Sequence, residues 1–356
     1  MIAPPWFEIP PTGYGGIEQV CAALVDGLVD RGHEVTLFGA GRGTGTRADF
    51  VPTTTELQFP RLGQALPELR HLARVDRLIE AGSYDIVHDH TTIGALAAPA
   101  RHVPTVVTVH QTPEGDLGDY LSWLDRRVRL VSISHAQRRS RPDVPWAATV
   151  HNGLAGTPVG RAAPTDGPVL WLARFDADKG PDLAIQACRA AGLPLVLIGK
   201  CRSAAEHRYY TEVIRPMLGD DTTVIRNGSR ADVDHLLATA RCLIMPIRWN
   251  EPFGMVMIEA MAAGTPVVAL RRGAAPEIVA HGRTGYLCDD PTDLPGWLHQ
   301  VGTLDPAECV AHVRRYFSAD TLARGYEEVY RAAIAHRGPA RIHTGAIHEP
   351  QPAALR

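Results

Sequence analysis

Two acidic residues frame an apolar segment in the second half of the chain. Glu251 and Glu259 are eight positions apart in E-P-F-G-M-V-M-I-E, which A-M-A-A-G-T-P follows. Gly254 stands where a helix would begin, and the helix N-terminus would present free N–H groups to an anion. Eight helical positions span roughly 12 Å, too far for two carboxylates to act on one atom as an acid/base pair. They could hold the two ends of a long polyhydroxylated ligand, although an ordinary amphipathic helix has the same spacing.

Two cations five positions apart follow an apolar run. Arg174 and Lys179 lie in L-A-R-F-D-A-D-K-G, and Lys179 and Lys200 are the only lysines among 36 basic residues. An arginine fork and a lysine point charge at a strand-to-helix turn could clamp a diphosphate, and a solvated charged loop would have the same pattern. Asp176 and Asp178 imitate a D-x-D metal motif, but their position between two cations argues against a divalent metal.

The first half offers a glycine loop and a histidine at a strand end. P-T-G-Y-G-G-I-E does not match G-x-G-x-x-G, which argues against a dinucleotide site. Gly15 and Gly16 still allow the backbone to approach a phosphate or sugar closely. His110 ends T-V-V-T-V-H and could donate to a sugar hydroxyl or remain structural. Asn227 and Gly228 end another apolar run and suit either a turn or part of a base pocket.

The elements that must position these residues alternate between short apolar runs and longer helical patterns. Strands are expected at 34–38, 85–88, 105–110, 130–134, 169–173, 195–199, 222–226, 242–246, 267–270 and 285–288, and helices at 16–31, 67–81, 181–191, 230–240 and 253–263. This alternation predicts an α/β fold of parallel sheets covered by helices, with two doubly wound, Rossmann-like halves. A Gly- and Pro-rich seam at 152–168 separates the halves. Ligands of such sheets bind beyond the carboxyl ends of the strands, across the cleft.

Length and composition fit two ordinary globular domains. The chain has 356 residues and a formal net charge of −3, so no basic field favours nucleic acid. We find no apolar run that could span a membrane, and the leucines and arginines of 60–81 are expected to pack on a sheet rather than contact a lipid surface. Six scattered cysteines suit a reduced, cytoplasmic protein. Only Met1–Ala3 precede the first prolines, so a first strand must be very short or begin before the assigned start, which leaves the anchoring of the glycine loop and full activity open.

The chain resembles the family 4 retaining glycosyltransferases of the GT-B fold, including a bacterial subgroup with antibiotic-pathway sugar transferases. The resemblance covers nearly the whole chain except its tail and rests, in order, on G-Y-G-G-I-E, R-G-H-E-V-T-L, D-I-V-H-D-H, T-V-V-T-V-H, H-N-G, A-R-x-x-x-x-K-G and E-P-F-G-M-V-M-I-E-A-M-A-A-G-T-P-V-V. The last two motifs together are the most specific. The resemblance implies an acceptor-side domain at 1–155, a nucleotide-sugar domain at 165–315, a helix at 316–336 that crosses back to the first domain, and a disordered tail at 337–356.

The same resemblance implies roles for the site residues. Arg174 and Lys179 would hold the donor diphosphate. Glu259 would hold the ribose, Glu251 the transferred hexose, and His110 would face the reacting carbon. The other expected donor-binding residues are Gly15, Gly16, Asn227, Gly228, Phe253, Gly254, Met255 and Val256. Transfer would proceed on the front face with retention, the leaving diphosphate would assist deprotonation of the acceptor, and neither a metal nor another cofactor would be needed.

Several properties remain open from the sequence. UDP is the expected donor nucleotide because it is the commonest in the family, with GDP and ADP as alternatives. The acceptor, a small molecule or a glycan, would be chosen by loops at 44–55, 111–120 and 134–145. The E-x₇-E and R-x₄-K patterns argue against a nucleotide-sugar epimerase on the same fold. The intact Glu251, Glu259, Arg174 and Lys179 argue against a homologue that only binds the donor. The missing dinucleotide-binding fingerprint argues against a nicotinamide dehydrogenase. The oligomeric state is not apparent.

Overall fold

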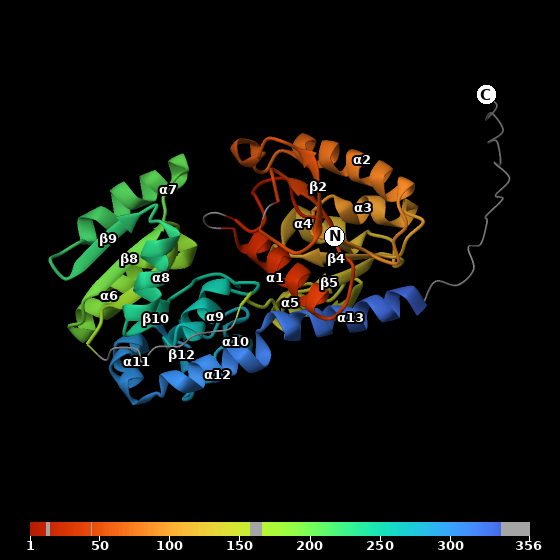
Figure 1. Cartoon of the computed structure of the whole chain (residues 1–356). Helices are drawn as coiled ribbons and strands as arrows, with labels where there is room; N and C mark the ends of the chain where they lie inside the picture. The colour runs from red at the N-terminus through yellow and green to blue at the C-terminus, as the bar shows by residue number, and fades with distance from the viewer. Residues whose placement is uncertain (12–14, 44, 157–165, 336–356) are drawn as a thin grey trace, which may run out of the picture.

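The computed structural model describes residues 1–11, 15–43, 45–156 and 166–335. Two α/β halves lie side by side, each built on a parallel sheet with helices on both faces (Figure 1). The prediction of two Rossmann-like halves is therefore confirmed. The proposed tail at 337–356 and the middle of the seam lie outside the described residues. Across the described part of the chain, every helix is too short or too polar to cross a membrane.

The first sheet is joined through the N-terminal residues. Its strands are β1 (Thr36–Ala40), β2 (Asp49–Thr54), β3 (Val87–Asp89), β4 (Thr105–Val109), β5 (Arg129–Ser132) and β6 (Trp146–Thr149). β1 pairs with β2, and β3 to β6 pair in sequence order, all in parallel. Ile2 connects the two groups by parallel bridges to Phe38 and Asp89. Its N–H donates to the carbonyl of His88 at 2.8 Å, and its carbonyl accepts from the N–H of His90 at 2.9 Å. The short first strand is thus one bridging residue, completely buried between its neighbours.

The prediction that residues 44–55, 111–120 and 134–145 form loops is wrong in part. These segments contain β2, α4 (Gly115–Ser122) and α5 (His135–Ser140). The sequence D-F-V-P-T-T does not look like a strand because Pro52 cannot donate to a ladder, but β2 is an edge strand, where proline is tolerated. β6 is the other edge and is too short for an alternating pattern to be visible.

Helices cover both faces of the first sheet. They are α1 (Gly16–Asp30), α2 (Ala65–Ala81), α3 (Gly94–Ala97), α4 and α5, with short 3₁₀ segments η1 (Phe59–Arg61) and η2 (Ala98–Ala100). Val106 of β4 packs with α1, whereas Val107 packs with α3 and α4 on the opposite face. Neighbouring strand residues point to opposite faces, so a run of valines can serve two layers at once.

The second sheet carries most of the expected site. Its strands are β7 (Val169–Arg174), β8 (Leu195–Lys200), β9 (Thr222–Arg226), β10 (Cys242–Met245), β11 (Val267–Leu270) and β12 (Gly285–Cys288), in the spatial order β12-β11-β10-β7-β8-β9. Every pairing is parallel. The strand bounds expected at 222–226, 267–270 and 285–288 are confirmed. The runs 267–270 and 285–288 are buried at every residue and largely apolar, as expected of buried strands. The strand 222–226 is an edge strand with no fully buried residue.

The helices of this half are α6 (Pro181–Ala191), α7 (Ala204–Tyr209), α8 (Arg230–Thr239), α9 (Met255–Ala262), α10 (Ala275–Ile278), α11 (Leu294–Gln300) and α12 (Pro306–Tyr316). Three of them were expected, and α6 and α8 begin at the predicted residues, whereas α7, α10, α11 and α12 were not expected. Short 3₁₀ or π segments are η3 (Ala177–Lys179), η4 (Tyr210–Ile214), η5 (Arg215–Met217), η6 (Pro291–Asp293) and η7 (Val301–Thr303). The helix expected from Phe253 starts two residues later, because Gly254 adopts a left-handed conformation with φ of 88°.

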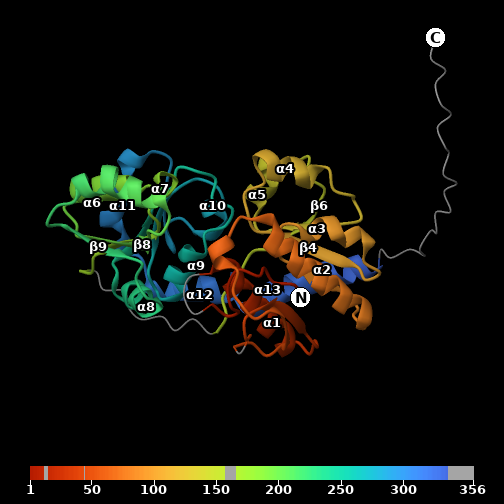
Figure 2. The same cartoon turned by 90° about the horizontal axis from the view of Figure 1, so that it is seen from above.

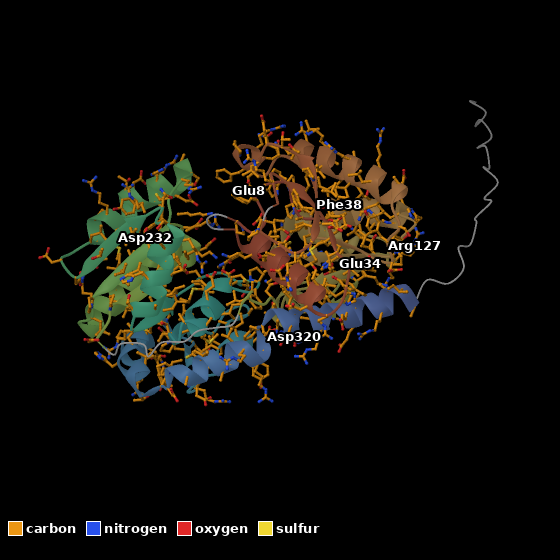
Figure 3. The ribbon with its side chains drawn as sticks, viewed as in Figure 1. Glu8, Glu34, Phe38, Arg127, Asp232 and Asp320 are labelled. Atoms are coloured by element: carbon orange, nitrogen blue, oxygen red, sulfur yellow. The ribbon has the colours of Figure 1, made fainter. Side chains whose placement is uncertain are left out.

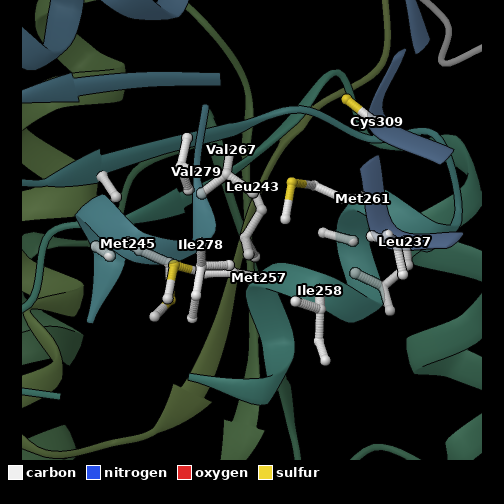
Figure 4. Packing of buried hydrophobic residues seen from close by; sticks show 14 of the residues in the cluster. Leu237, Leu243, Met245, Met257, Ile258, Met261, Val267, Ile278, Val279 and Cys309 are labelled. Carbon is white, nitrogen blue, oxygen red and sulfur yellow. The ribbon is translucent and has the colours of Figure 1, made fainter. Parts of the chain in front are cut away.

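Helix α9 is fixed in the core by its apolar side chains. Met257, Ile258 and Met261 are fully buried and pack with strand residues such as Leu243 and Val267 (Figure 4). Burial of such side chains is worth about 1.5–3 kcal/mol each. The position of the N-terminus of α9 therefore follows from core packing and not from its exposed loop.

Helix α13 (Ala319–Ala335) follows the second half and passes beneath the first (Figure 1). Glu327 accepts hydrogen bonds from Arg31 at 2.8 Å and from His33 at 2.9 Å. Asp320, at the start of α13 on the lower side of the molecule (Figure 3), pairs with the same arginine at 2.9 Å. Gly27 of α1 allows the close approach, since a Cβ there would lie 2.6 Å from the carbonyl oxygen of Ala319. These contacts join α13 to α1 in the first half.

Candidate functional site

A cavity of about 900 Å³ lies between the halves, beyond the carboxyl ends of β4, β7, β8 and β10. Met255, the first residue of α9, also packs against the α1 and α13 cluster, so α9 borders the first half (Figure 2). Twelve of the thirteen expected site residues line the cavity: Gly16, His110, Arg174, Lys179, Asn227, Gly228, Glu251, Phe253, Gly254, Met255, Val256 and Glu259. Gly15 is not among the lining residues and instead precedes α1 as its N-cap.

The two walls of the cavity differ in charge. Among the described residues, the charged groups that line the cavity are Arg174, Lys179, Lys200, Arg202, Arg230, Glu251 and Glu259, and all of these come from the second half. The first half contributes Gly16, Ile17, Gln19, His110, Gln111, Thr112, Ile133 and Asn152. Five cations against two carboxylates give the second wall a positive balance, which suits an anionic ligand.

Lys179 and Glu251 form an ion pair with each other. The Lys179 Nζ lies 2.5 Å from Glu251 Oε2, and each side chain is only 13% exposed. Trp249 adds a hydrogen bond from Nε1 to the same oxygen at 3.2 Å, and its ring lies 4.3 Å from the ammonium. The carbonyl of Lys179 accepts from Trp171 Nε1 at 3.0 Å, which fixes the backbone from the core side. The two residues that the resemblance assigns to different parts of a donor therefore touch in this structure.

Two further cations, Arg174 and Lys200, lie at the ends of β7 and β8. Arg174 is half exposed, and its ion pair with Glu206 is long at 3.7 Å. Such a pair contributes little in the absence of a ligand, so this guanidinium can turn toward an anion at small cost. Burial lowers the pKa of Lys200, at the end of β8, to about 8, and the nearby Arg202 contributes to this lowering. Together these groups form a cationic edge along β7 and β8.

The D-A-D segment has a local structural role. Asp176 Oδ1 accepts from the N–H of Asp178 at 3.1 Å and so caps η3. Among the described residues, we find no group of three or more His, Cys, Asp or Glu side chains placed to hold a metal.

Glu259 connects the two halves within the cavity. Arg230 Nη1 donates to Glu259 Oε1 at 3.1 Å. Gln19 of α1, with its amide oriented to satisfy both neighbours, donates to the same oxygen at 3.0 Å and accepts from Arg230 at 3.2 Å. The carboxylate thus sits at the cavity wall with these donors on one side, and it can accept hydrogen bonds from ligand hydroxyls on the other.

The N-terminus of α9 opens into the cavity. Gly254 is the N-cap and makes no side-chain cap, and the lining includes Phe253, Gly254, Met255 and Val256. The first N–H groups of a helix have no intrahelical partners, and the helix dipole adds a partial positive charge. This end of α9 is therefore suited to a phosphate or to sugar oxygens.

His110 is held in a neutral form by its surroundings. Burial lowers its pKa to about 4, and its Nε2 lies 3.0 Å from Nδ1 of His90. The Nε2 of His90 is buried and has no partner in the described part of the chain. His88 is occupied elsewhere, with hydrogen bonds at 2.7 Å to Tyr330 and to Thr108. The three histidines therefore form a structural layer with His110 at the cavity.

Asn227 and Gly228 shape the far wall of the cavity. Asn227 has φ of 58°, its Oδ1 accepts from the N–H of Cys201 at 3.0 Å, and its Nδ2 donates to the carbonyl of Cys201 at 3.2 Å. A Cβ on Gly228 would lie 2.6 Å from Ile198 Cδ1. These residues make a tight turn that forms this part of the wall, as one of the two sequence interpretations expected.

Several lining residues were not expected individually as donor-site residues. They include Gln19, Asn152, Lys200, Arg202, Arg230 and Trp249. Gln111 and Thr112 also line the cavity and belong to the loop 111–120 that was expected to choose the acceptor. Lys200 was noticed only for its rarity, and its strand-end position adds a second signal; Asn152 stands in H-N-G. The others carry no local signal, because only the folded chain brings them to the cavity.

The comparisons with known proteins agree with this arrangement. Residues 14–140 match the family described as Glycosyltransferase Family 4, and residues 160–294 match Glycosyl transferases group 1. The D-inositol 3-phosphate glycosyltransferase of Mycolicibacterium smegmatis is 30% identical over 331 residues, which cover 80% of this chain and 73% of that relative. The chain belongs to the family 4 glycosyltransferases.

Solved structures of other glycosyltransferases share the GT-B fold of this chain. AviGT4, a glycosyltransferase involved in avilamycin A biosynthesis, superposes with a TM-score of 0.72 at 24% identity, covering 94% of this chain and 97% of the other. Anabaena HepE in complex with UDP and glucose gives a TM-score of 0.69 at 19% identity, covering 93% and 98%. Another relative, the D-inositol 3-phosphate glycosyltransferase of Mycobacterium sp. strain KMS, is 30% identical over 310 residues. The matched region covers 74% of this chain and 64% of that relative.

Proposed function

We propose that this family 4 chain transfers a hexose from a nucleoside-diphosphate sugar to an acceptor hydroxyl, with retention of anomeric configuration. The observation that carries the proposal is one cavity with a cationic edge, an open helix N-terminus and two separated carboxylates. A diphosphate would lie against Arg174, Lys179 and the N-terminus of α9. Glu259 would accept from the ribose hydroxyls and Glu251 from the hexose.

The transfer step develops negative charge where the cavity is positive. The bond between the anomeric carbon and the diphosphate oxygen breaks, and its electron pair goes to the diphosphate. The acceptor oxygen forms the new bond on the same face, and its proton goes to the departing diphosphate oxygen. Arg174 and Lys179 would stabilise this developing charge, and electrostatic stabilisation of this kind supplies much of the rate enhancement in many enzymes. The neutral His110 could donate a hydrogen bond near the reacting carbon.

UDP is the proposed nucleotide, and the cations are proposed to make a divalent metal unnecessary. The HepE structure, which has the same fold, holds UDP and glucose, and this supports UDP here. The Asp176 carboxylate of the D-A-D segment caps η3, which supports metal independence.

Thermal unfolding with UDP, GDP, ADP, CDP and NAD tests the donor class. A ligand at about 100 times its Kd adds roughly 2.7 kcal/mol, a shift of several degrees. We expect one nucleoside diphosphate to stabilise both the wild type and Arg324→Gln, a control that removes an exposed cation of α13. The same ligand should stabilise Lys179→Gln much less. NMR of the product formed from the matching sugar donor reports the anomer. Stabilisation by none of the five ligands, or a product with inverted configuration, would contradict the proposal.

A further inference from the structure

A largely buried carboxylate of the second half contacts the first half. Glu277 lies on α10, and its side chain is 13% exposed. Its two oxygens accept from the N–H groups of His135 at 2.8 Å and Ala136 at 2.6 Å, the first two residues of α5. The same carboxylate lies 2.9 Å from Nε2 of His151, which follows β6. Helices α5 and α10 therefore meet across the boundary between the halves (Figure 2).

The donors around Glu277 explain why a carboxylate stands there. The first N–H groups of a helix have no intrahelical partner, and hydrogen bonds to a charged acceptor are shorter and stronger than neutral ones. The guanidinium of Arg139 adds a long ion pair at 3.6 Å. All of these partners belong to the first half, so the carboxylate gains them only when the two halves are together. The contact therefore favours the arrangement in which the two walls of the cavity face each other.

On the first-half side, α5 is tied to the backbone around His110. Gln137 of α5 is buried, and its Nε2 donates to the carbonyl of Val109 at 2.9 Å and to that of Gln111 at 2.8 Å. These two carbonyls flank His110, which lines the cavity. A displacement of α5 would therefore move the end of β4 and His110 with it.

On the second-half side, α10 is tied to the backbone of Glu251. The N–H of Ala274 donates to the carbonyl of Glu251 at 2.9 Å, and the N–H of Glu277 donates to the carbonyl of Ala274 at 2.9 Å. The short turn from Ala274 to Glu277 thus contacts Glu251 at one end and the first half at the other. A path of hydrogen bonds and short backbone segments therefore connects Glu251 on one wall with His110 on the other.

We propose that Glu277 is a positioning residue for the transfer reaction, which fixes the distance between His110 and Glu251 on the opposite walls of the cavity. The proposal rests on the proposed function, because only a reaction that uses both walls requires their separation to be fixed. A misplacement of about 1 Å by a residue remote from the chemistry can lower a rate roughly 100-fold. UDP binding should depend on Glu277 much less, since the cations proposed to hold the diphosphate lie in the second half.

Spin-label distances test the contact itself. The six native cysteines are all buried, so labels at Arg126→Cys in the first half and Arg208→Cys on α7 report the separation of the halves. With UDP bound, we expect one narrow distance distribution in the wild-type background and a broader one with a longer mean distance in Glu277→Ala. Glu308→Ala, which removes an exposed ion pair to Arg283 within the second half, should leave the distribution unchanged.

Donor hydrolysis tests the role in catalysis. The UDP-sugar that the wild type hydrolyses fastest is chosen from UDP-glucose, UDP-galactose and UDP-N-acetylglucosamine, with water as the acceptor. Glu277→Ala should lower kcat at least about tenfold, while the Kd for UDP, measured by calorimetry, stays near the wild-type value. Glu277→Gln keeps one acceptor oxygen, so its kcat should lie between those of the wild type and Glu277→Ala. Glu308→Ala should hydrolyse the donor at the wild-type rate.

Three results would overturn the inference alone. One is an unchanged distance distribution in Glu277→Ala, and another is an unchanged kcat in that variant. The third is a Kd for UDP that rises as much as kcat falls, because the loss would then be one of general structure. A wild type that no nucleoside diphosphate stabilises would instead fail the proposed function, and the role of Glu277 in transfer with it.

Discussion

Replacing Lys179 by glutamine tests the diphosphate clamp most directly. In this structure the ammonium does two things, because it pairs with Glu251 at 2.5 Å and lines the cavity. Removing one partner of a largely buried pair leaves the other charge uncompensated. With both side chains 13% exposed, we expect a loss of about 2 kcal/mol in the free energy of unfolding. A hydrogen bond to a charged group is worth about 1.5–3 kcal/mol, so UDP affinity should fall roughly 10- to 100-fold.

Stability and ligand affinity must be separated in the assay. Urea unfolding gives the free energy for wild type, Lys179→Gln, Glu251→Gln and the double variant, and calorimetry gives the Kd for UDP and for the UDP-sugar. Because Glu251→Gln removes a competitor for the ammonium, UDP should bind this variant at least as tightly as wild type. The same variant should turn over the sugar donor more slowly, since the carboxylate no longer accepts from the hexose. The coupling between the two positions in unfolding should be about 1–3 kcal/mol.

The outcome that would refute the reasoning is specific. If Lys179→Gln remains folded and binds UDP with an unchanged Kd, the ammonium serves only the ion pair, and the clamp assignment is wrong. If Glu251→Gln weakens UDP as much as it weakens the UDP-sugar, the carboxylate does not recognise the hexose.

Four further perturbations have defined outcomes. Glu327→Gln should lower the melting temperature most near neutral pH. A hydrogen bond from the Arg31 guanidinium lowers the pKa of the Glu327 carboxyl from 4.5 to about 2. The stabilisation by this carboxylate is therefore complete above pH 4.5 and disappears as the pH falls toward 2. A difference that does not change with pH would contradict this. Gly282→Ala should cost about 1–2 kcal/mol because this glycine has a positive φ and a Cβ there meets no other atom, and Gly273→Ala should cost more because its Cβ would also overlap backbone atoms. Only Gly273→Ala should also raise the donor KM, since its Cβ would lie 2.3 Å from the carbonyl oxygen of Glu251, and equal KM values would argue against the role of that loop. The acidic limb of kcat should fall near pH 4, where His110 becomes protonated, and a limb near 6.5 would exclude this histidine. EDTA should change the transfer rate less than twofold, and loss of activity that Mg²⁺ or Mn²⁺ restores would disprove metal independence.

The sequence by itself determined the α/β class and the positions of the site on the sheets. The strand at 267–270 is buried along its whole length, so it appears as a continuous apolar run that needs no tertiary information. Gly254 and the segment that follows it also predict a helix N-terminus facing a ligand, because the cap and the apolar pattern are local. The edge strands β2 and β6 of the first sheet were missed, since β2 contains a proline and β6 is short.

Only the tertiary structure decided which charges meet. Lys179 and Glu251 are 72 positions apart, and their contact depends on how the loops after β7 and β10 pack side by side. Likewise, no local pattern predicts that Gln19 reaches Glu259 across the cavity or that the first wall is free of charged lining residues in the described chain. Local sequence specifies the backbone conformation and the periodicity of buried residues. Contacts between side chains that are distant in the sequence are instead fixed by the packing of helices and strands against one another. That packing places five cations on one wall and, among the described lining residues, only uncharged groups on the other.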